Sequence, residues 1–241
     1  NVQLHSKLLL VQGNVTHSLR QRFLGTGGAN DNIVFPDLQL VIKDNVVEDV
    51  TEAGNSIIEI QGSLPRLVIE GNKFGNTQGY GIRLGPGGGV LTGGVIISNN
   101  DITSSTSPIY IETTTAGIAA RNYVITGNRL RSTGGRGIDV FANLAAITGL
   151  VIGNNLIDID TAAAPNEGIL IRHNGANLVT RWTCTGNLIR RLGAAMTHGV
   201  RVTGGNSDRL TVGFNVIEGA TTLGVDVGTS TNTDIAHNMT A

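Results

Sequence analysis

Acidic, basic and aromatic residues recur at one position of a short segment that this chain repeats. The copies read GIRL, PIYI, GIDV, GILI, GVRV and GVDV, and their third residues include Arg83, Tyr110, Asp139, Arg201 and Asp226. A carboxylate in such a place can transfer a proton, and an arginine beside it can bind a substrate carboxylate through two hydrogen bonds. The third position of this segment is therefore the first place to look for a functional site.

Two carboxylates of this segment have a spacing that suits sugar chemistry. Side chains two residues apart on a strand face the same way, so Glu112 shares a face with Tyr110. If successive copies stack as neighbouring strands, Glu112 and Asp139 lie on a diagonal of roughly 8 Å. Carboxylates that far apart can invert a glycosidic bond through a water molecule. We therefore predict that Asp139 and Glu112 are the catalytic residues if the chain is an enzyme, which would then be a polysaccharide-degrading glycosidase or lyase.

Rings and guanidinium groups surround this pair and are expected to bind substrate. Tyr110 and Phe141 can stack on sugar faces, and arginines can pair with uronate or sialate carboxylates. The predicted arginines are Arg83, Arg172 and Arg201. The alternative stays open, because acids and arginines that alternate on stacked strands also form ordinary cross-strand ion pairs on a solvated surface.

An octet with a fixed asparagine lies between these segments. It reads apolar, any, apolar, any, small or polar, Asn, any, apolar, as in LVIEGNKF (67–74) and YVITGNRL (123–130). Period-2 alternation on both sides of the asparagine predicts two short strands with a sharp bend between them. The shared asparagines are Asn14, Asn45, Asn72, Asn100, Asn128, Asn155, Asn187, Asn215 and Asn238.

These repeats predict an all-β fold, a right-handed single-stranded parallel β-helix of about nine coils with three short strands per coil. The asparagines would form a ladder along one corner, as amides do in cross-β stacks. Because the residue before the asparagine varies and is even Phe214 in one copy, we expect the asparagine itself to hold the left-handed backbone conformation. Cys184 falls in an inward position and is predicted to be a small buried hydrophobe.

The organisation is expected to be an irregular first coil and connection over 1–39, followed by a regular β-helix over 40–241. The chain reads as an excerpt of a longer protein. The third strand of the first coil falls in either 18–23 or 32–35, and the sequence does not choose between them.

Composition excludes several functional classes. The formal net charge of the 241 residues is −1, which argues against a nucleic-acid binder, and no apolar run is long enough for membrane insertion. His173 and His198 are expected in loops, without the spacing of a metal-ligand set, and Asp158 with Asp160 is weak evidence for calcium. The glycine-rich stretch 85–94 lacks the lysine of a phosphate loop. No cofactor and no metal are predicted.

The asparagine octets together with the GIxV segments resemble the pectin-lyase-like superfamily over about residues 40–240, and in style they are most similar to bacteriophage tailspike β-helices. The resemblance implies a homotrimer on a virion tail, or an extracellular protein, with bacterial surface polysaccharide as partner. Three functions follow as alternatives. The first is a receptor-binding module that binds, and in some forms cleaves, a bacterial glycan. The second is a secreted polysaccharide lyase, hydrolase or epimerase, and the third is a non-catalytic rod or adhesin.

Overall fold

The octets fold as strand pairs because their apolar and polar residues alternate. In β4 (Gln39–Lys43) the side chains of Leu40 and Ile42 are buried while those between them are partly exposed. The computed structural model describes residues 8–26, 39–61, 64–85, 94–114, 120–161, 166–193, 196–205 and 207–241. Strands are the only regular elements in these ranges, so the described residues include no helix that could cross a membrane.

Three parallel sheets, here named A, B and C, contain all of the strands found in the described residues. Sheet A holds the first half of each octet: β1 (Leu8–Gln12), β4, β7 (Arg66–Glu70), β10 (Val95–Ser98), β13 (Ala120–Thr126), β16 (Ile147–Gly153), β19 (Val179–Thr185), β22 (Asp208–Gly213) and β25 (Thr231–Ala236). Sheet B holds the second half: β2 (Val15–His17), β5 (Val46–Glu48), β8 (Lys73–Thr77), β11 (Asp101–Ser104), β14 (Arg129–Ser132), β17 (Leu156–Ile159), β20 (Leu188–Arg191), β23 (Val216–Glu218) and β26 (Met239–Thr240). Sheet C holds the GIxV segments: β3 (Leu24–Thr26), β6 (Ile58–Ile60), β9 (Ile82–Leu84), β12 (Ile109–Glu112), β15 (Ile138–Ala142), β18 (Glu167–His173), β21 (His198–Thr203) and β24 (Leu223–Asp226).

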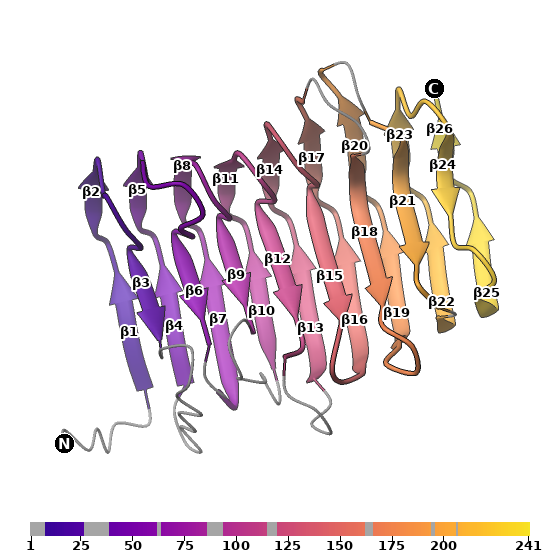
Figure 1. Ribbon diagram of the computed structural model, residues 1–241, viewed down its shortest axis with the longest axis horizontal. Coiled ribbons are helices and arrows are strands. Elements are labelled where there is room, and N and C mark those ends of the chain that lie inside the picture. Colours follow the sequence, from indigo (N-terminus) through magenta and orange to yellow (C-terminus); the bar gives the residue numbers. More distant parts are fainter. Residues whose placement is uncertain are drawn as a thin grey trace.

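The coils stack along a rod, and each strand pairs with the strands one coil before and after it (Figure 1). The predicted parallel β-helix is confirmed, and the part of the chain that the structure describes has nine strands in each of sheets A and B and eight in sheet C. The last coil ends after two strands, and seven coils bury their corner asparagine, so the expected nine coils overstate the number of complete turns.

The core is a set of stacked aliphatic layers. Inward residues of one coil lie on the equivalent residues of the next, as Ile97, Ile125 and Ile152 do in sheet A. Trp182 and Cys184 take the same inward positions in β19, and both side chains are fully buried. The prediction for Cys184 is confirmed.

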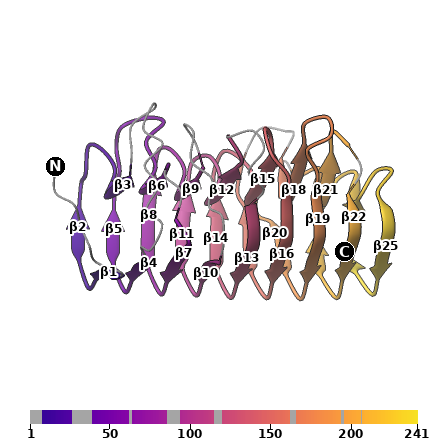
Figure 2. The same cartoon turned by 90° about the horizontal axis from the view of Figure 1, so that it is seen from below.

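The bend between sheets A and B forms a straight row along the rod (Figure 2), and the asparagine ladder runs beside it. Each asparagine amide donates to the side-chain oxygen of the next asparagine, at 2.8–2.9 Å from Asn14 through to Asn238. The same oxygen also accepts the backbone N–H of the preceding asparagine, at 3.0 Å for Asn100 on Asn128. The amides therefore link the coils on the inner side of the corner.

The left-handed residue at this corner is the one before the asparagine, so the assignment to the asparagine was wrong. Positive φ values occur at Gly13, Asp44, Gly71, Asn99, Gly127, Asn154, Gly186, Phe214 and His237. This arrangement turns the asparagine side chain inward, where it reaches the next coil. Phe214 accepts a φ of 55° and stays 67 % exposed, with its ring stacked on His237.

Glycine and Asp or Asn alternate at this left-handed position over seven coils, from Gly13 to Gly186. The alternation has a steric basis. A Cβ atom on Gly127 would lie 2.5 Å from Oδ1 of Asn99, and one on Gly186 would lie 2.5 Å from Oδ1 of Asn154. The larger side chain of one coil thus occupies the space that the glycine of the next coil leaves open.

The start of the chain differs from the sequence prediction in detail. The third strand of the first coil is β3, Leu24–Thr26, which directly follows segment 18–23 and pairs with β6. The other candidate, 32–35, lies outside the described residues, as does most of the glycine-rich stretch 85–94.

Candidate functional site

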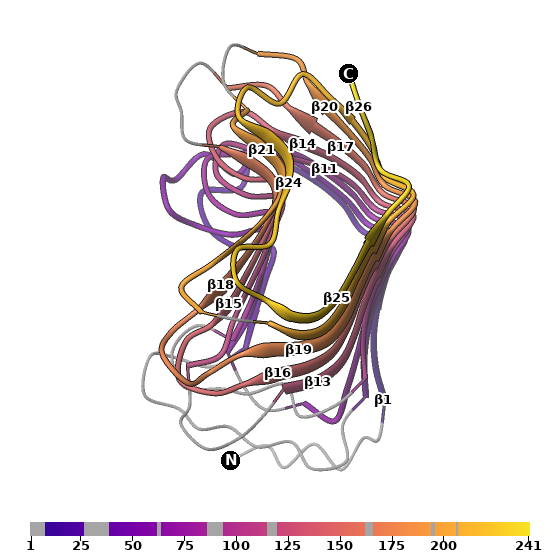
Figure 3. The ribbon, with the colours of Figure 1, turned by 90° about the vertical axis from the view of Figure 1, so that its right-hand side faces the viewer.

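The outer face of sheet C brings the predicted site residues into two adjacent rows. Arg83, Tyr110 and Asp139 pair in register across β9, β12 and β15, and the row continues through Leu170 to Arg201. Glu112, Phe141 and Arg172 form the second row. In the end view, the coloured connections on either side of sheet C project beyond it, so this face lies between two rows of loops (Figure 3).

Asp139 lies beneath arginine side chains and is only 3 % exposed. Arg172 donates to both of its oxygens, from Nε at 2.9 Å and from Nη2 at 3.0 Å. Arg136 adds a third contact at 3.3 Å. Burial raises the pKa of the Asp139 carboxyl above its ordinary value, and the two arginines partly offset that effect. Burial alone would lower the pKa of Arg172, but the contacts with Asp139 and then with Tyr110 together outweigh it, and the pKa is raised.

Glu112 has a different environment, since its side chain is partly exposed. It accepts a hydrogen bond from the Tyr110 hydroxyl at 2.7 Å and another from the Asn143 amide at 2.8 Å. Burial, followed by the hydrogen bond to Glu112, raises the pKa of the Tyr110 hydroxyl, so this group stays protonated and keeps donating. The two predicted catalytic carboxylates therefore differ in exposure and in partners.

Rings and guanidinium groups form a continuous file across the coils. Tyr80 stacks on Tyr110 with ring centroids 4.8 Å apart, and Arg83 lies 5.3 Å from the Tyr80 ring. Arg172 lies 5.9 Å from the Tyr110 ring and 4.3 Å from the Phe141 ring. We call these five residues the aromatic file. Tyr80 was missed because it precedes the GIRL segment by one residue, although an aromatic residue flanking the repeat was visible in the sequence.

A second ionic group follows along the same face. Glu167 is buried and pairs with Arg136 at 3.0 Å and with Arg201 at 3.3 Å, and Arg201 also lies 3.7 Å from Asp226. Arg136 and Glu167 were not predicted, because they stand just before the repeated segment. At the other end of the face, Glu59 pairs with Arg22 at 3.2 Å.

The charges of this face balance. Five carboxylates and five arginines take part in the contacts above, and three of the carboxylates are buried beneath the guanidinium groups. The acids are Glu59, Glu112, Asp139, Glu167 and Asp226, and the arginines are Arg22, Arg83, Arg136, Arg172 and Arg201. The surface thus presents guanidinium planes and the partly exposed rings of Tyr80 and Phe141, while Tyr110 is buried beneath them, and it has little net charge.

The histidines lie in strands rather than in the predicted loops. His173 ends β18 and His198 begins the neighbouring strand β21, so the two side chains stand at opposite ends of these paired strands. His173 Nε2 lies 3.1 Å from the Ser207 hydroxyl, which also accepts from the Trp182 indole, and burial lowers the pKa of His173. Burial, followed by the charge of Arg201, also lowers the pKa of His198.

No metal centre is assembled among the residues that the structure describes, where no three His, Cys, Asp or Glu side chains could share an ion. The two aspartates considered for calcium are paired with arginines instead. Asp158 accepts two hydrogen bonds from Arg190, at 2.8 and 2.9 Å, and Asp160 pairs with Arg131.

Comparisons of the sequence with protein-family models and with curated proteins, and of the fold with solved structures, found no match. The arrangement of this face is therefore the basis for a functional proposal.

Proposed function

We propose that this chain is a glycan-binding β-helix whose binding surface is the outer face of sheet C, in the manner of a bacteriophage tailspike that binds bacterial surface polysaccharide. The observation that carries the proposal is the aromatic file of Tyr80, Arg83, Tyr110, Phe141 and Arg172. Rings pack on the apolar faces of sugars, and the free N–H groups of guanidinium planes donate to hydroxyl groups.

The charge balance of the face defines the kind of ligand. Both ends of the Arg172 fork are occupied by Asp139, so Arg172 is not free to clamp a substrate carboxylate. Binding would then depend on stacking and hydroxyl contacts more than on net charge. We expect an affinity at this face that changes little between low and moderate salt, because an electrically neutral surface releases few counterions.

A glycan array tests this proposal directly, with bacterial polysaccharides as probes. The variants Phe141→Leu and Tyr80→Leu remove a ring but keep an apolar side chain, so the fold is expected to persist. Both variants should lose most of the array signal. The matched control is Val151→Thr, an exposed residue on sheet A that lies on a different face. An array signal that survives both ring variants, or the lack of any signal from the unaltered chain, would refute the proposal.

Cleavage of the bound glycan, as in a lyase, hydrolase or epimerase, is the second candidate. It is supported by the direction of the Asp139 pKa, which burial raises, because a carboxyl group with a raised pKa is a better general acid than an ordinary one. The counter-argument is that both oxygens of Asp139 are paired with arginine, an arrangement typical of a structural ion pair. New reducing ends or unsaturated uronate, abolished in both Asp139→Asn and Glu112→Gln, would establish catalysis at this site. Product formation unaffected by these changes would place the chemistry elsewhere.

A homotrimer on a virion tail, or an extracellular location, belongs to the same proposal. Its support is the likeness of the repeats to tailspike sequences. Measurement of the mass in solution by light scattering tests it, because a stable monomer would favour the third alternative, a non-catalytic rod, if the glycan array is also negative.

A further inference from the structure

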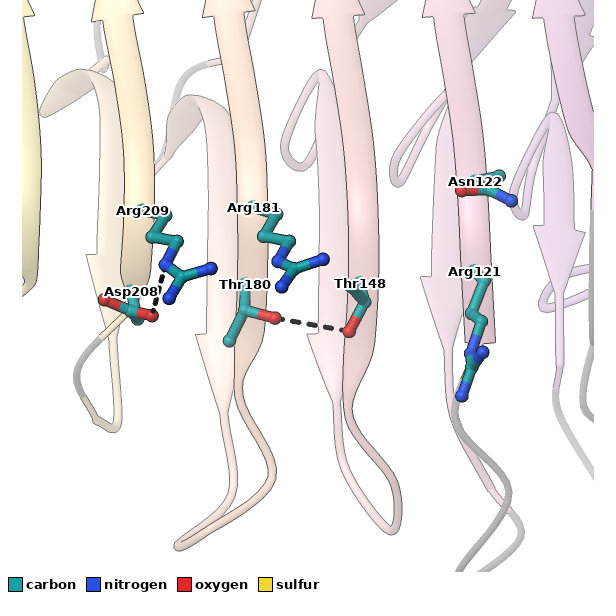
Figure 4. Close-up of a pocket in the computed structure, with 7 residues that line it drawn as sticks. All are labelled: Arg121, Asn122, Thr148, Thr180, Arg181, Asp208 and Arg209. Carbon is teal, nitrogen blue, oxygen red and sulfur yellow. Dashed lines mark hydrogen bonds and ion pairs between the residues drawn. The ribbon is translucent and has the colours of Figure 1, made fainter.

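A basic groove lies on sheet A, away from the face discussed above. It has a volume of about 590 Å³ and is lined by Arg121, Asn122, Thr148, Thr180, Arg181, Asp208 and Arg209 (Figure 4). These residues come from the first halves of β13, β16, β19 and β22, which at six or seven residues are longer than β4, β7 and β10.

The groove follows from a second column of left-handed residues. Asn122, Gly149, Arg181 and Arg209 have φ values of 57°, 75°, 52° and 55°, and they stand at equivalent places in four successive strands. Gly149 carries no side chain, and Oδ1 of Asn122 from the preceding coil lies 3.1 Å from where its Cβ atom would be. The hydroxyls of Thr148 and Thr180, 3.2 Å apart, line the groove beside this glycine and offer donors and acceptors to a ligand.

Three arginines line the groove. Arg181 and Arg209 lie side by side on neighbouring strands with their side chains pointing the same way, and Arg121 stands two strands from Arg181 (Figure 4). That separation is about 10 Å, from a strand spacing of ~4.8 Å. Arg121 and Arg181 have no carboxylate partner among the described residues, while Arg209 lies 3.5 Å from Asp208. The groove therefore carries a net positive charge in a chain whose net charge is −1.

The backbone at two of these arginines is in an unfavourable conformation. Left-handed φ values suit glycine and asparagine, which occupy the same column at Gly149, Asn122 and Asn232. The backbone preference of arginine does not favour this conformation, and residues with a strained backbone concentrate at functional sites. Arg181 and Arg209 hold exposed guanidinium groups at the edge of a groove, which is consistent with such a use.

We propose that this groove binds an acidic polysaccharide, with the carboxylate or sulfate groups of the sugar on Arg121, Arg181 and Arg209 and its hydroxyls on Thr148 and Thr180. Guanidinium forks bind carboxylate and sulfate oxygens through two hydrogen bonds, and arginines on three different strands can contact more than one anionic group of a polymer. This site stands on another sheet and does not depend on the function proposed for sheet C.

Isothermal titration calorimetry tests the proposal with polygalacturonate oligosaccharides, dextran sulfate, unmodified dextran and inorganic phosphate. At least one of the two acidic polymers should bind saturably and more weakly as salt rises, whereas dextran should not bind. Arg181→Asn and Arg209→Asn retain a residue that accepts the left-handed conformation, so thermal unfolding should be unchanged or shifted upward. Each should weaken binding by about tenfold, as expected for one lost charge-assisted contact.

Arg129→Asn is the control, because it removes the same charge from an exposed position on sheet B. It should leave the affinity unchanged. Which acidic polymer binds distinguishes carboxylate from sulfate recognition. Three results would overturn the proposal: binding of phosphate alone, no saturable binding of either acidic polymer, or an equal loss of affinity in Arg129→Asn and Arg181→Asn.

Discussion

Replacement of one ladder asparagine in the middle of the rod should destabilise the protein far more than replacement of the first one. Asn128 is 1 % exposed and its amide donates to Asn155 Oδ1 at 2.9 Å, to the Ile97 carbonyl at 2.9 Å and to the Thr126 carbonyl at 3.1 Å. Its Oδ1 accepts from the backbone N–H and the amide of Asn100, at 3.0 and 2.9 Å. Asn128→Ala removes all of these hydrogen bonds at once.

The magnitude follows from the groups left behind. The Asn100 N–H loses its acceptor inside the structure, and one buried donor without a partner costs about 1–3 kcal/mol. The Ile97 and Thr126 carbonyls each lose a donor as well, which brings the expected loss in the free energy of unfolding to about 3 kcal/mol. No backbone strain changes, because the left-handed residue is Gly127 and not Asn128.

Asn14 provides the matched control within the same ladder. It is exposed, and its amide donates to Asn45 Oδ1 at 2.8 Å and to the Gln12 carbonyl at 3.3 Å. No described asparagine precedes it to lose an acceptor, so Asn14→Ala should cost under about 1 kcal/mol. Equilibrium urea unfolding followed by circular dichroism measures both variants. Equal losses in the two variants, or a loss below about 1 kcal/mol for Asn128→Ala, would refute the view that the ladder stabilises the stack.

Three further predictions concern other parts of the rod. Gly127→Ala should lower stability by about 1–2 kcal/mol more than Gly13→Ala, because both backbones are left-handed but only a Cβ atom at Gly127 would have a neighbour within 4 Å. Thermal unfolding of the two variants measures this steric difference. Burial lowers the pKa of His173 below 6.5, so the unfolded chain binds the proton first as the pH falls; the free energy of unfolding should then decrease as the pH drops below about 6.5, with a shallower pH dependence in His173→Gln. Cys184 is fully buried and its pKa is raised to about 12, so a thiol reagent should react with it only after denaturation, and rapid labelling of the native protein would contradict the core described here.

The fold was predictable because the spacing between successive octets is the length of one coil. One asparagine per repeat and two alternating apolar positions placed the ladder and the inward layers, including Cys184. The same pattern did not predict which corner residue takes the left-handed backbone conformation. A positive φ is unfavourable for a phenylalanine considered alone. Phe214 adopts it because the bend turns the Asn215 side chain inward, where its amide donates to Asn238 Oδ1.

The sequence predicted which residues of the candidate site share a face of the sheet, but it did not predict which of them are buried. Alternation along β12 and β15 placed Glu112 and Asp139 on one outer face, as expected from the period of two. That Asp139 is buried depends on Arg136 and Arg172, whose side chains reach over it from a connection and from the next coil. Such coverage is a property of neighbouring coils, and a single segment of sequence does not contain it.

The alternation of glycine with Asp or Asn from Gly13 to Gly186 gives this part of the rod a repeat of two coils rather than one. If the coil that carries Gly127 were removed, Asn99 would face Asn154, and its Oδ1 would meet a Cβ atom where a hydrogen now leaves room. Removal of two consecutive coils would restore the order of small and large residues. Engineered shortening or lengthening of this rod should therefore succeed more readily in even steps, and duplication of an adjacent pair of coils is the natural way for such a chain to grow.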